Sequence, residues 1–508
     1  MIKLDASILE EIPKIQVEGV TYTEPWCYFT NVHTRIKKVT LEEYRTFLSQ
    51  VVDAGFEIVK QFDDGLGDVL YCAVLKKGEK ILYMMYITWS KYIYISYSVD
   101  PYAPTWSGED VFAEIPSCSG HRSEFHNPVD YGAGNYVVEL DCITKKAYLA
   151  YLKELESKEF QQFATNEEGI DGKAFCANYA KGSLYVTVVY LESMKKMYVS
   201  ACFDQPFSEH LLYSDTYLEG NKEDAKTTLH MLKLDGGGNG FVWKLKNGHF
   251  IISDGGLPQD TEILYNYLEK ETPEGEIPVV EAWFISHGHA DHCGAFDQIV
   301  DKPEKYGGRI FVEGIYYNEP NDLVMALDPG ICKGSTVLIK DALEILKTTS
   351  GEAPKIYRTQ TGQRYYFNDI TVDIVVGQEQ IPFKHYACDL NDSSTWCMFN
   401  VEGQKCLFGG DGDKGGMHFI TCAYDQSYME IDMFTLLHHG WATQDFFTDH
   451  CKIKTVLNTC LGAQKGKLPA PKEKENAYLK SKAEEWFSFE DGTKVMSFPY
   501  EIGSYETR

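Results

Sequence analysis

The sequence is poor in basic residues and has no long apolar run. It contains 48 lysines and arginines against 75 aspartates and glutamates, a formal net charge of −27. This charge repels phosphate backbones, so it disfavours nucleic acid as a partner without excluding a local basic groove. No run approaches the length that crosses a bilayer, and the first residues lack the apolar core of a signal peptide. We therefore expect a cytoplasmic protein with no membrane partner.

The 14 cysteines include no Cys-x-x-Cys pair. Most lie inside apolar stretches such as Leu70-Tyr71-Cys72-Ala73, where a reduced thiol acts as a small core side chain. This pattern excludes a disulfide framework and a zinc knuckle as the basis of the fold. The fold must therefore be stabilised by a hydrophobic core, which the 44% of residues that are hydrophobic can form.

Residues 40–100 match residues 144–204 when the chain is compared with itself at a shift of 104 residues. Fourteen positions are identical, against roughly four expected by chance in such a window. The recurring residues include Thr40, Tyr44, Phe56, Cys72 and Tyr86, which return as Thr144, Tyr148, Phe160, Cys176 and Tyr190. We interpret residues 1–225 as a duplicated α+β module and residues 226–508 as a separate domain, since 508 residues suggest at least two domains.

Each copy of the module is predicted to begin with an amphipathic helix. In the first copy Tyr44, Leu48 and Val51 share one helical face, and Thr40 occupies the N-cap position. Short apolar stretches that indicate an antiparallel meander follow, at about 69–75, 81–87 and 92–98. The module is thus predicted as one helix and three strands (αβββ), twice. It contains no metal or triad spacing, which favours a structural or interaction role over a substrate-selecting lid.

An apolar run from Val279 to Ile285 ends in a segment that is dense in metal-capable side chains. The segment reads Ser286-His287-Gly288-His289-Ala290-Asp291-His292. The apolar run predicts a buried strand, and a carboxylate beside three imidazoles at its end needs a metal or another partner if it is buried. Nitrogen and carboxylate donors suit divalent ions, Zn²⁺ foremost, with Mn²⁺ or Fe²⁺ as alternatives.

This segment resembles the signature loop of the metallo-β-lactamase fold superfamily, whose members are mostly metal-dependent hydrolases. The resemblance covers residues 230 to roughly 460, and further motifs follow in the family's order. Asp254-Gly255-Gly256 ends a hairpin built around Asn247-Gly248, Asp411 ends the strand that starts at Cys406, and the pair His438-His439 follows another strand. The resemblance implies an αββα sandwich for residues 226–508, so we expect a chain of the α+β or α/β class.

Two positions depart from the family's usual pattern. Most members carry a ligand histidine just before the strand that starts near Trp396, where this chain has Asn391-Asp392-Ser393-Ser394. The Asn-x-x-Ser pattern and the paired histidines resemble the branch that contains the nuclease domain of the DNA-uptake competence channel. His385 is the nearest histidine, and a core or rim role suits it better than metal ligation. Trp441 stands where that branch usually has serine.

The resemblance implies two divalent ions held by two groups of ligands that share one carboxylate. The groups are His287, His289 and Asp411 for one ion, and Asp291, His292, Asp411 and either His438 or His439 for the other. Asn391, Asp392 or water would complete the first group. The resemblance also implies catalytic roles for Asp291 and Asn391, a metal-bound hydroxide as nucleophile, and Asp254 as a support for the metal loop.

Hydrolysis of a small-molecule substrate is the expected activity, and the bond that is cleaved stays open. The Asn-x-x-Ser pattern and the paired histidines favour a phosphodiester or another small phosphate ester. A lactone, thioester or lactam is the second expectation. The third expectation is a non-catalytic metal-binding protein that acts through its duplicated module. No Gly-x-Ser-x-Gly or Cys/His pattern competes as nucleophile.

Overall fold

The described part of the chain falls into two compact units. The computed structural model describes residues 6–15, 19–22, 26–28, 31–66, 70–78, 80–87, 91–99, 110–118, 125–130, 134–140, 143–318, 343–380, 390–460 and 468–508. The first unit contains Met1–Asp130, Asn135–Phe160 and Lys195–Ala201, and the second contains Tyr131–Gly134, Gln161–Met194 and Cys202–Arg508. Among the helices in the described ranges, none is long and apolar enough to cross a membrane. The domain boundary near residue 225 stays a prediction.

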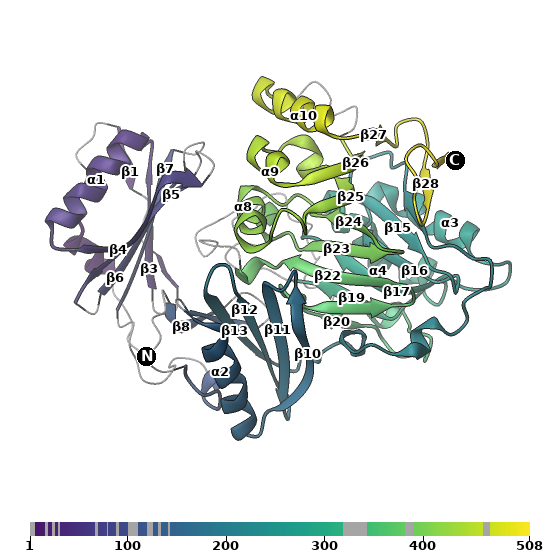
Figure 1. Ribbon diagram of the computed structural model, residues 1–508, viewed down its shortest axis with the longest axis horizontal. Coiled ribbons are helices and arrows are strands. Elements are labelled where there is room, and N and C mark those ends of the chain that lie inside the picture. Colours follow the sequence, from purple (N-terminus) through teal and green to yellow (C-terminus); the bar gives the residue numbers. More distant parts are fainter. Residues whose placement is uncertain are drawn as a thin grey trace. The chain divides into compact units, whose positions relative to one another are not determined.

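In the first unit, helix α1 (Leu41–Asp53) packs on one face of a seven-stranded antiparallel sheet (Figure 1). The order is β1-β3-β7-β6-β5-β4 with β2 beside β3, and the bounds are β1 Thr21–Tyr22, β2 Trp26–Tyr28, β3 Asn31–Lys37, β4 Glu57–Leu66, β5 Leu70–Lys77, β6 Lys80–Ile87 and β7 Tyr92–Val99. A capping box starts the helix, because the Glu43 carboxylate accepts the Thr40 N–H at 2.6 Å and the Thr40 hydroxyl accepts the Glu43 N–H. Its apolar stripe, which includes Phe47 and Val51, is buried against alternate residues of β5, β6 and β7.

The elements of the second predicted copy begin and end 104 residues after those of the first. They are α2 (Lys145–Ser157), β10 (Gln161–Ile170), β11 (Ala174–Lys181), β12 (Leu184–Leu191) and β13 (Lys196–Phe203). With β8 (Phe125–Asp130) and β9 (Tyr136–Leu140), these strands form a six-stranded sheet in the order β10-β11-β12-β13-β9-β8. The origin of the two segments by duplication stays a prediction.

Each helix is followed by four strands, whereas the sequence predicted three. The missed strands, β4 and β10, are the edge strands of their sheets, and both contain bulges in their pairing. A bulged edge strand loses the strict alternation of polar and apolar residues by which a strand is recognised. The sequence of β10, with its exposed Gln161, Gln162, Glu167 and Glu168, illustrates this loss.

Most of the second unit is formed by two further sheets. The nine-stranded sheet has the order β20-β19-β17-β16-β15-β14-β28-β29 with β18 beside β17, and its bounds are β14 Thr228–Met231, β15 Gly240–Lys244, β16 Phe250–Asp254, β17 Val279–Ile285, β18 Phe311–Val312, β19 Gly314–Tyr317, β20 Lys355–Tyr357, β28 Lys494–Ser497 and β29 Glu506–Thr507. The seven-stranded sheet runs β21 to β27 in sequence order, with bounds β21 Arg364–Phe367, β22 Ile370–Val376, β23 Trp396–Val401, β24 Gln404–Phe408, β25 Glu430–Thr435, β26 Lys452–Asn458 and β27 Glu485–Ser488.

These two sheets lie against each other (Figure 1). Aromatic side chains fill the core between them. Trp243 of the first sheet stacks on Phe399 of the second at 5.2 Å between ring centroids. Helices cover the outer faces: α3 (Thr261–Glu271) and α4 (Ala290–Asp301) on one side, α8 (Lys414–Ala423), α9 (Asp445–His450) and α10 (Ala470–Lys482) on the other. Phe296 of α4 packs on Trp283, and Phe447 of α9 packs on Trp396. The layers agree with the predicted mixed α and β class.

Strands β10 and β11 contact the sandwich within the second unit through a polar network. Asn178 is almost fully buried, and its side-chain oxygen accepts an N–H from Gln363 at 3.2 Å. Asn166 donates to the carbonyl oxygen of Gly362 at 3.1 Å. Gly362 has a positive φ of 89°, and a Cβ there would meet the Cβ of Cys176 at 2.9 Å. The backbone can approach β11 this closely only because the residue is glycine.

The predicted hairpin at Asn247-Gly248 connects β15 to β16, and Glu281 of β17 holds it in place. The Glu281 carboxylate accepts the Asn247 amide N–H at 2.7 Å and contacts His249 Nδ1 at 2.9 Å. The hydrogen bond to Glu281 raises the pKa of His249 above its usual value, although partial burial opposes this shift.

We expect Glu281→Gln to lower the pKa of His249 toward its ordinary value. Because the folded pKa is raised, protonated His249 stabilises the fold below about pH 6.5, and this contribution is lost as the pH rises through the folded pKa. The deficit in the free energy of unfolding of Glu281→Gln should therefore be larger at about pH 5.5 than at about pH 9. An NMR titration and urea unfolding at both pH values measure the two effects. Glu276→Gln, which removes an exposed carboxylate nearby, is the control. An unchanged pKa of His249 in Glu281→Gln would contradict the assignment.

Candidate metal centre

The candidate site lies where the carboxyl ends of five strands meet. Strands β16 and β17 are parallel neighbours in one sheet, and β24, β25 and β26 are parallel neighbours in the other. Asp254 ends β16, the segment 287–292 follows β17, Asp411 follows β24, the pair 438–439 follows β25, and Thr459 follows β26. Carboxyl ends of parallel strands share an edge of a sheet, so these segments are brought together by the topology.

The metal loop is fixed by close backbone contacts. After β17 the chain passes through His287 and Gly288, and His289 is the N-cap residue of α4 without using its side chain as a cap. Asp291 and His292 therefore stand on the first turn of α4. A Cβ at Gly238 would lie 2.0 Å from the carbonyl oxygen of Asp291. The backbone at Gly238, just before β15, therefore packs against this first turn of α4, and only glycine permits the contact.

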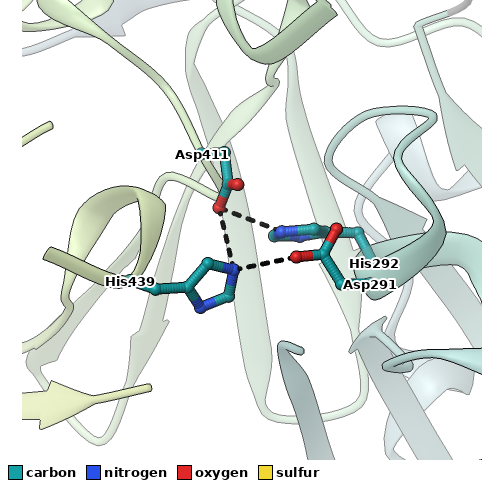
Figure 2. A group of neighbouring side chains, drawn as sticks. All are labelled: Asp291, His292, Asp411 and His439. Atoms are coloured by element: carbon teal, nitrogen blue, oxygen red, sulfur yellow. Dashed lines mark ion pairs between the residues drawn. The ribbon is translucent and has the colours of Figure 1, made fainter. Parts of the chain in front are cut away.

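Four of the predicted ligands form one group of side chains: Asp291, His292, Asp411 and His439 (Figure 2). His292 Nε2 lies 2.9 Å from Asp411 Oδ1, and His439 Nε2 lies 3.5 Å from the same oxygen. His439 Nε2 also lies 3.3 Å from Asp291 Oδ2. One donor atom from each residue lies within 4.8 Å of the others. His287, His289 and Asp411 form a second such group, so Asp411 belongs to both.

The donor atoms of this group converge on one small region of the interior. His292 Nδ1 contacts Asp254 Oδ2 at 2.7 Å, which places a proton on Nδ1 and leaves the lone pair on Nε2 facing the cluster. His292 Nε2, His439 Nε2 and Asp411 Oδ1 are all buried and make no hydrogen bond, although they are close together. Imidazole and carboxylate donors that face one another in a buried site need positive charge among them, which protons or a metal ion can supply. The residues therefore fit a divalent metal, and their nitrogen and oxygen donors suit Zn²⁺, Mn²⁺ or Fe²⁺.

Without an ion, the two clustered imidazoles carry the compensating positive charge: burial opposes protonation of His292 and His439, yet Asp411 and the other nearby carboxylates raise the pKa of both rings above its usual value. Burial opposes the charge of Asp411, yet His292, His439 and His438 hold its pKa well below the usual value. Burial also opposes the charge of Asp291, whose pKa is nevertheless lowered by His292 and His439. Both carboxylates are thus ionised at neutral pH. Burial lowers the pKa of His287 well below its usual value, which keeps this imidazole neutral and able to act as a ligand.

The paired histidines are separated by an unusual turn. Both have left-handed backbone angles, φ 47° and ψ 45° at His438 and φ 50° and ψ 30° at His439, and Gly440 follows with φ 92°. The turn directs His439 into the cluster, where it is buried and contacts Thr459 Oγ1 through Nδ1 at 3.1 Å. His438 is one-third exposed and lies 3.6 Å from Asp411 Oδ2. Left-handed non-glycine residues cost energy, so the surrounding structure must maintain this turn.

The other residues that the sequence singled out lie in different surroundings or outside the described residues. Asn391 is buried in the 3₁₀ turn Leu390–Ser393, beside the segment in which Thr395 N–H donates to Ser286 O at 2.9 Å. Its catalytic role stays a prediction. The side chain of Asp392 and the whole of His385 lie outside the described residues. Asp413, the competitor of Asp411, instead caps α8.

Sequence reasoning missed two residues that hold the site. Thr459 positions His439 from the end of β26, and a lone threonine carries no pattern by which it could be found. Gly238 permits the close approach to Asp291, and the glycine run 236–238 was a weak signal for it. Asp254, expected only as a support near the loop, contacts His292 directly.

Comparisons with solved structures give distant similarities. No protein-family model and no curated protein matches the chain. Igni18, described as a novel metallo hydrolase from the hyperthermophilic archaeon Ignicoccus hospitalis KIN4/I, aligns at 13% identity and a TM-score of 0.31, over 54% of this chain and 100% of that one. A protein of unknown function from Enterococcus faecalis V583 aligns at 14% identity and a TM-score of 0.24, over 42% of this chain and 49% of that one. TM-scores this low do not define a family for this chain.

We expect Asp411→Asn to remove most of the bound metal, because both donor groups lose their shared carboxylate. Asp413→Asn is the matched control: it removes a carboxylate two residues away and keeps the helix cap. The metal content of both proteins is measured after dialysis against zinc, and circular dichroism checks the fold. Wild-type zinc content in a folded Asp411→Asn protein would refute the assignment.

His438→Gly should stabilise the metal-free protein by about 0.5 to 1 kcal/mol, because glycine adopts the left-handed angles without strain. Gly440→Ala should have the opposite effect, since a Cβ there would lie 2.7 Å from Asn476 Nδ2. Thermal melting in the presence of a chelator measures both. A lower melting temperature for His438→Gly would show that its side chain contributes more to stability than the strain removes.

Proposed function

We propose that this protein is a metal-dependent hydrolase of the metallo-β-lactamase fold that binds two divalent ions. The observation that carries the proposal is the buried carboxylate of Asp411, which is shared by two groups of converging donors. Zinc is the favoured ion, and manganese and iron are the alternatives. The favoured substrate is a phosphodiester or another small phosphate ester.

The proposed ligands are those of the two groups, with His439 as the ligand of the histidine pair. His287, His289 and Asp411 would hold one ion, and Asp291, His292, Asp411 and His439 the other. When bound, such ions lower the pKa of water toward neutrality and polarise the oxygen of the bond that is cleaved. The partly exposed His438 stays at the rim of the cluster, where it can contact a substrate.

The chain's own residues would keep the ligands in place. Asp254 holds the proton of His292 on Nδ1 and also accepts the Ser286 N–H at 2.8 Å, which fixes the start of the metal loop. Thr459 fixes the ring of His439 in the same way. Second contacts of this kind tune metal affinity and ligand orientation. Asp291 and Asn391 are the proposed catalytic residues beside the ions.

The substrate class is supported by the sequence pattern around the site. The segment Asn391-x-x-Ser394 and the adjacent His438 and His439 favour a phosphoryl centre over a carbonyl centre. The net charge of −27 weakens long nucleic acid as a substrate and favours a small ester. The two αβ segments of the first half, which we regard as copies of one duplicated module, are assigned a structural or interaction role.

We expect the zinc-loaded or manganese-loaded protein to hydrolyse bis-p-nitrophenyl phosphate in preference to a chromogenic lactam and a thioester. His289→Ala and Asp411→Ala should abolish the activity and the metal loading without unfolding the protein. Asp254→Asn should reduce metal affinity or activity by about 10- to 100-fold, because it acts through His292. Turnover of the lactam or thioester alone would reverse the substrate assignment. Undiminished phosphodiester turnover in Asp411→Ala would exclude the proposed centre.

A further inference from the structure

Ser286 stands between strand β17 and the metal loop, and its side chain lies inside the protein. Its hydroxyl oxygen is 3.0 Å from Asp254 Oδ2, 3.0 Å from His287 Nδ1 and 3.3 Å from His292 Nδ1. His287 belongs to one of the two donor groups and His292 to the other. A single hydroxyl group therefore contacts Asp254 and one histidine of each group.

The carboxylate of Asp254 decides the direction of these hydrogen bonds. An ionised carboxylate only accepts, and a serine hydroxyl has one proton to donate. Ser286 therefore donates its proton to Asp254 Oδ2, and toward His287 it can act only as an acceptor. This arrangement places a proton on His287 Nδ1, so Nε2 carries the lone pair that a metal ion would need.

The other ring nitrogen of His287 faces its own donor group. His287 Nε2 lies 3.0 Å from Nδ1 of His289, which is the second histidine of that group. Burial lowers the pKa of His287, so the ring is neutral in the metal-free protein and carries its proton on one nitrogen or the other. The partner of Nδ1 decides between these two tautomers, and Ser286 is that partner.

Close packing holds the side chain of Ser286 in this position. Gly410 directly precedes the shared carboxylate of Asp411, and a Cβ at Gly410 would lie 2.5 Å from Ser286 Oγ. The Ser286 N–H donates to Asp254 Oδ1 at 2.8 Å, and the Ser286 carbonyl oxygen accepts the Thr395 N–H at 2.9 Å. The backbone of Ser286 is thus fixed on both sides, and its hydroxyl is directed at Asp254 and His287.

We propose that Ser286 is a positioning residue that extends the action of Asp254 from His292 to His287, so that one buried Asp–Ser pair orients a ligand in each donor group. Among the described residues, Asp254 contacts His292 directly and reaches His287 through the hydroxyl of Ser286. The two ion positions would then share this support as well as the carboxylate of Asp411. The inference rests on the proposed function for the presence of the ions.

The first test measures the tautomer of His287 in the metal-free protein by long-range ¹H–¹⁵N NMR of the imidazole nitrogens. The wild type should carry the proton on Nδ1. Ser286→Ala should shift the tautomer ratio toward Nε2 protonation by about fivefold, because Nδ1 loses its acceptor. Asp254→Asn should shift the ratio in the same direction, because an amide can donate to the Ser286 hydroxyl and reverse its hydrogen bond to His287. An unchanged ratio in Ser286→Ala would overturn the inference.

The second test measures the zinc affinity of the full-length protein by competition with a chromophoric chelator. Ser286→Ala should weaken the binding of an ion by about 10- to 100-fold, which is the usual effect of losing a hydrogen bond to a ligand histidine. The double variant Asp254→Asn/Ser286→Ala should lose less affinity than the product of the two single losses, because both changes disrupt the same pair. Losses that multiply fully would contradict a shared support.

Ser208→Ala is the matched control, because it removes another buried serine hydroxyl, which contacts the Tyr316 hydroxyl at 2.8 Å. This variant should keep the tautomer ratio and the zinc affinity of the wild type. Ser286→Thr retains a hydroxyl and should restore both quantities to within about threefold of the wild type. Thermal melting verifies that each variant is folded. A folded Ser286→Thr protein that behaves like Ser286→Ala would show that the hydroxyl is not the cause.

The tautomer measurement needs neither metal nor substrate, so its failure can be distinguished from failure of the proposed function. If the tautomer ratio and the zinc affinity change as expected but the wild type hydrolyses no ester, the hydrolase proposal fails and the role of Ser286 stands. If the wild type hydrolyses the phosphodiester but Ser286→Ala keeps the wild-type ratio and affinity, the role of Ser286 fails and the hydrolase proposal stands.

Discussion

The carboxylate of Asp411 is the constraint on which the second half of the structure depends. It is almost completely buried, and it faces the ring nitrogens of three histidines. A charge in such a place is tolerated only when positive charge surrounds it and the remaining donors are held by other groups. The contact between Asp254 and His292 and the left-handed turn before Trp441 serve this purpose. The strained backbone turn thus lies at the candidate metal centre, where we expect the reaction to take place.

The two-sheet arrangement explains why the donors come from distant parts of the sequence. β16 and β17 lie in one sheet and β24, β25 and β26 in the other, and within each group the strands run in the same direction. Side chains at the ends of these strands converge without any long loop. The glycines near the site, of which Gly238 and Gly410 are examples, leave room where backbone passes next to a ligand segment.

The sequence predicted the site residues that stand close together in the chain or that follow one another in a recognisable order. The spacing from His287 to His292 and the order of Asp411 and the histidine pair could be read directly, because ligands of this kind are rare on adjacent strand ends. The sequence could not predict that His439, rather than His438, is the buried member of the pair, since this depends on backbone angles that no local pattern reveals. The edge strands β4 and β10 were missed for a related reason: their bulges disturb the alternation that marks a strand.

The amide network around Asn178 and Gln363 makes residues Gln161–Met194 part of the sandwich's own packing. A shortened protein that begins at residue 226, where the sequence analysis places the boundary, would lack these strands and the hydrogen bonds that they form with Gly362 and Gln363. Gly362 and Gln363, which contact β10 and β11 in the full chain, would then lose these partners. An isolated metal-binding half that keeps this buried polar network must therefore retain β10 and β11.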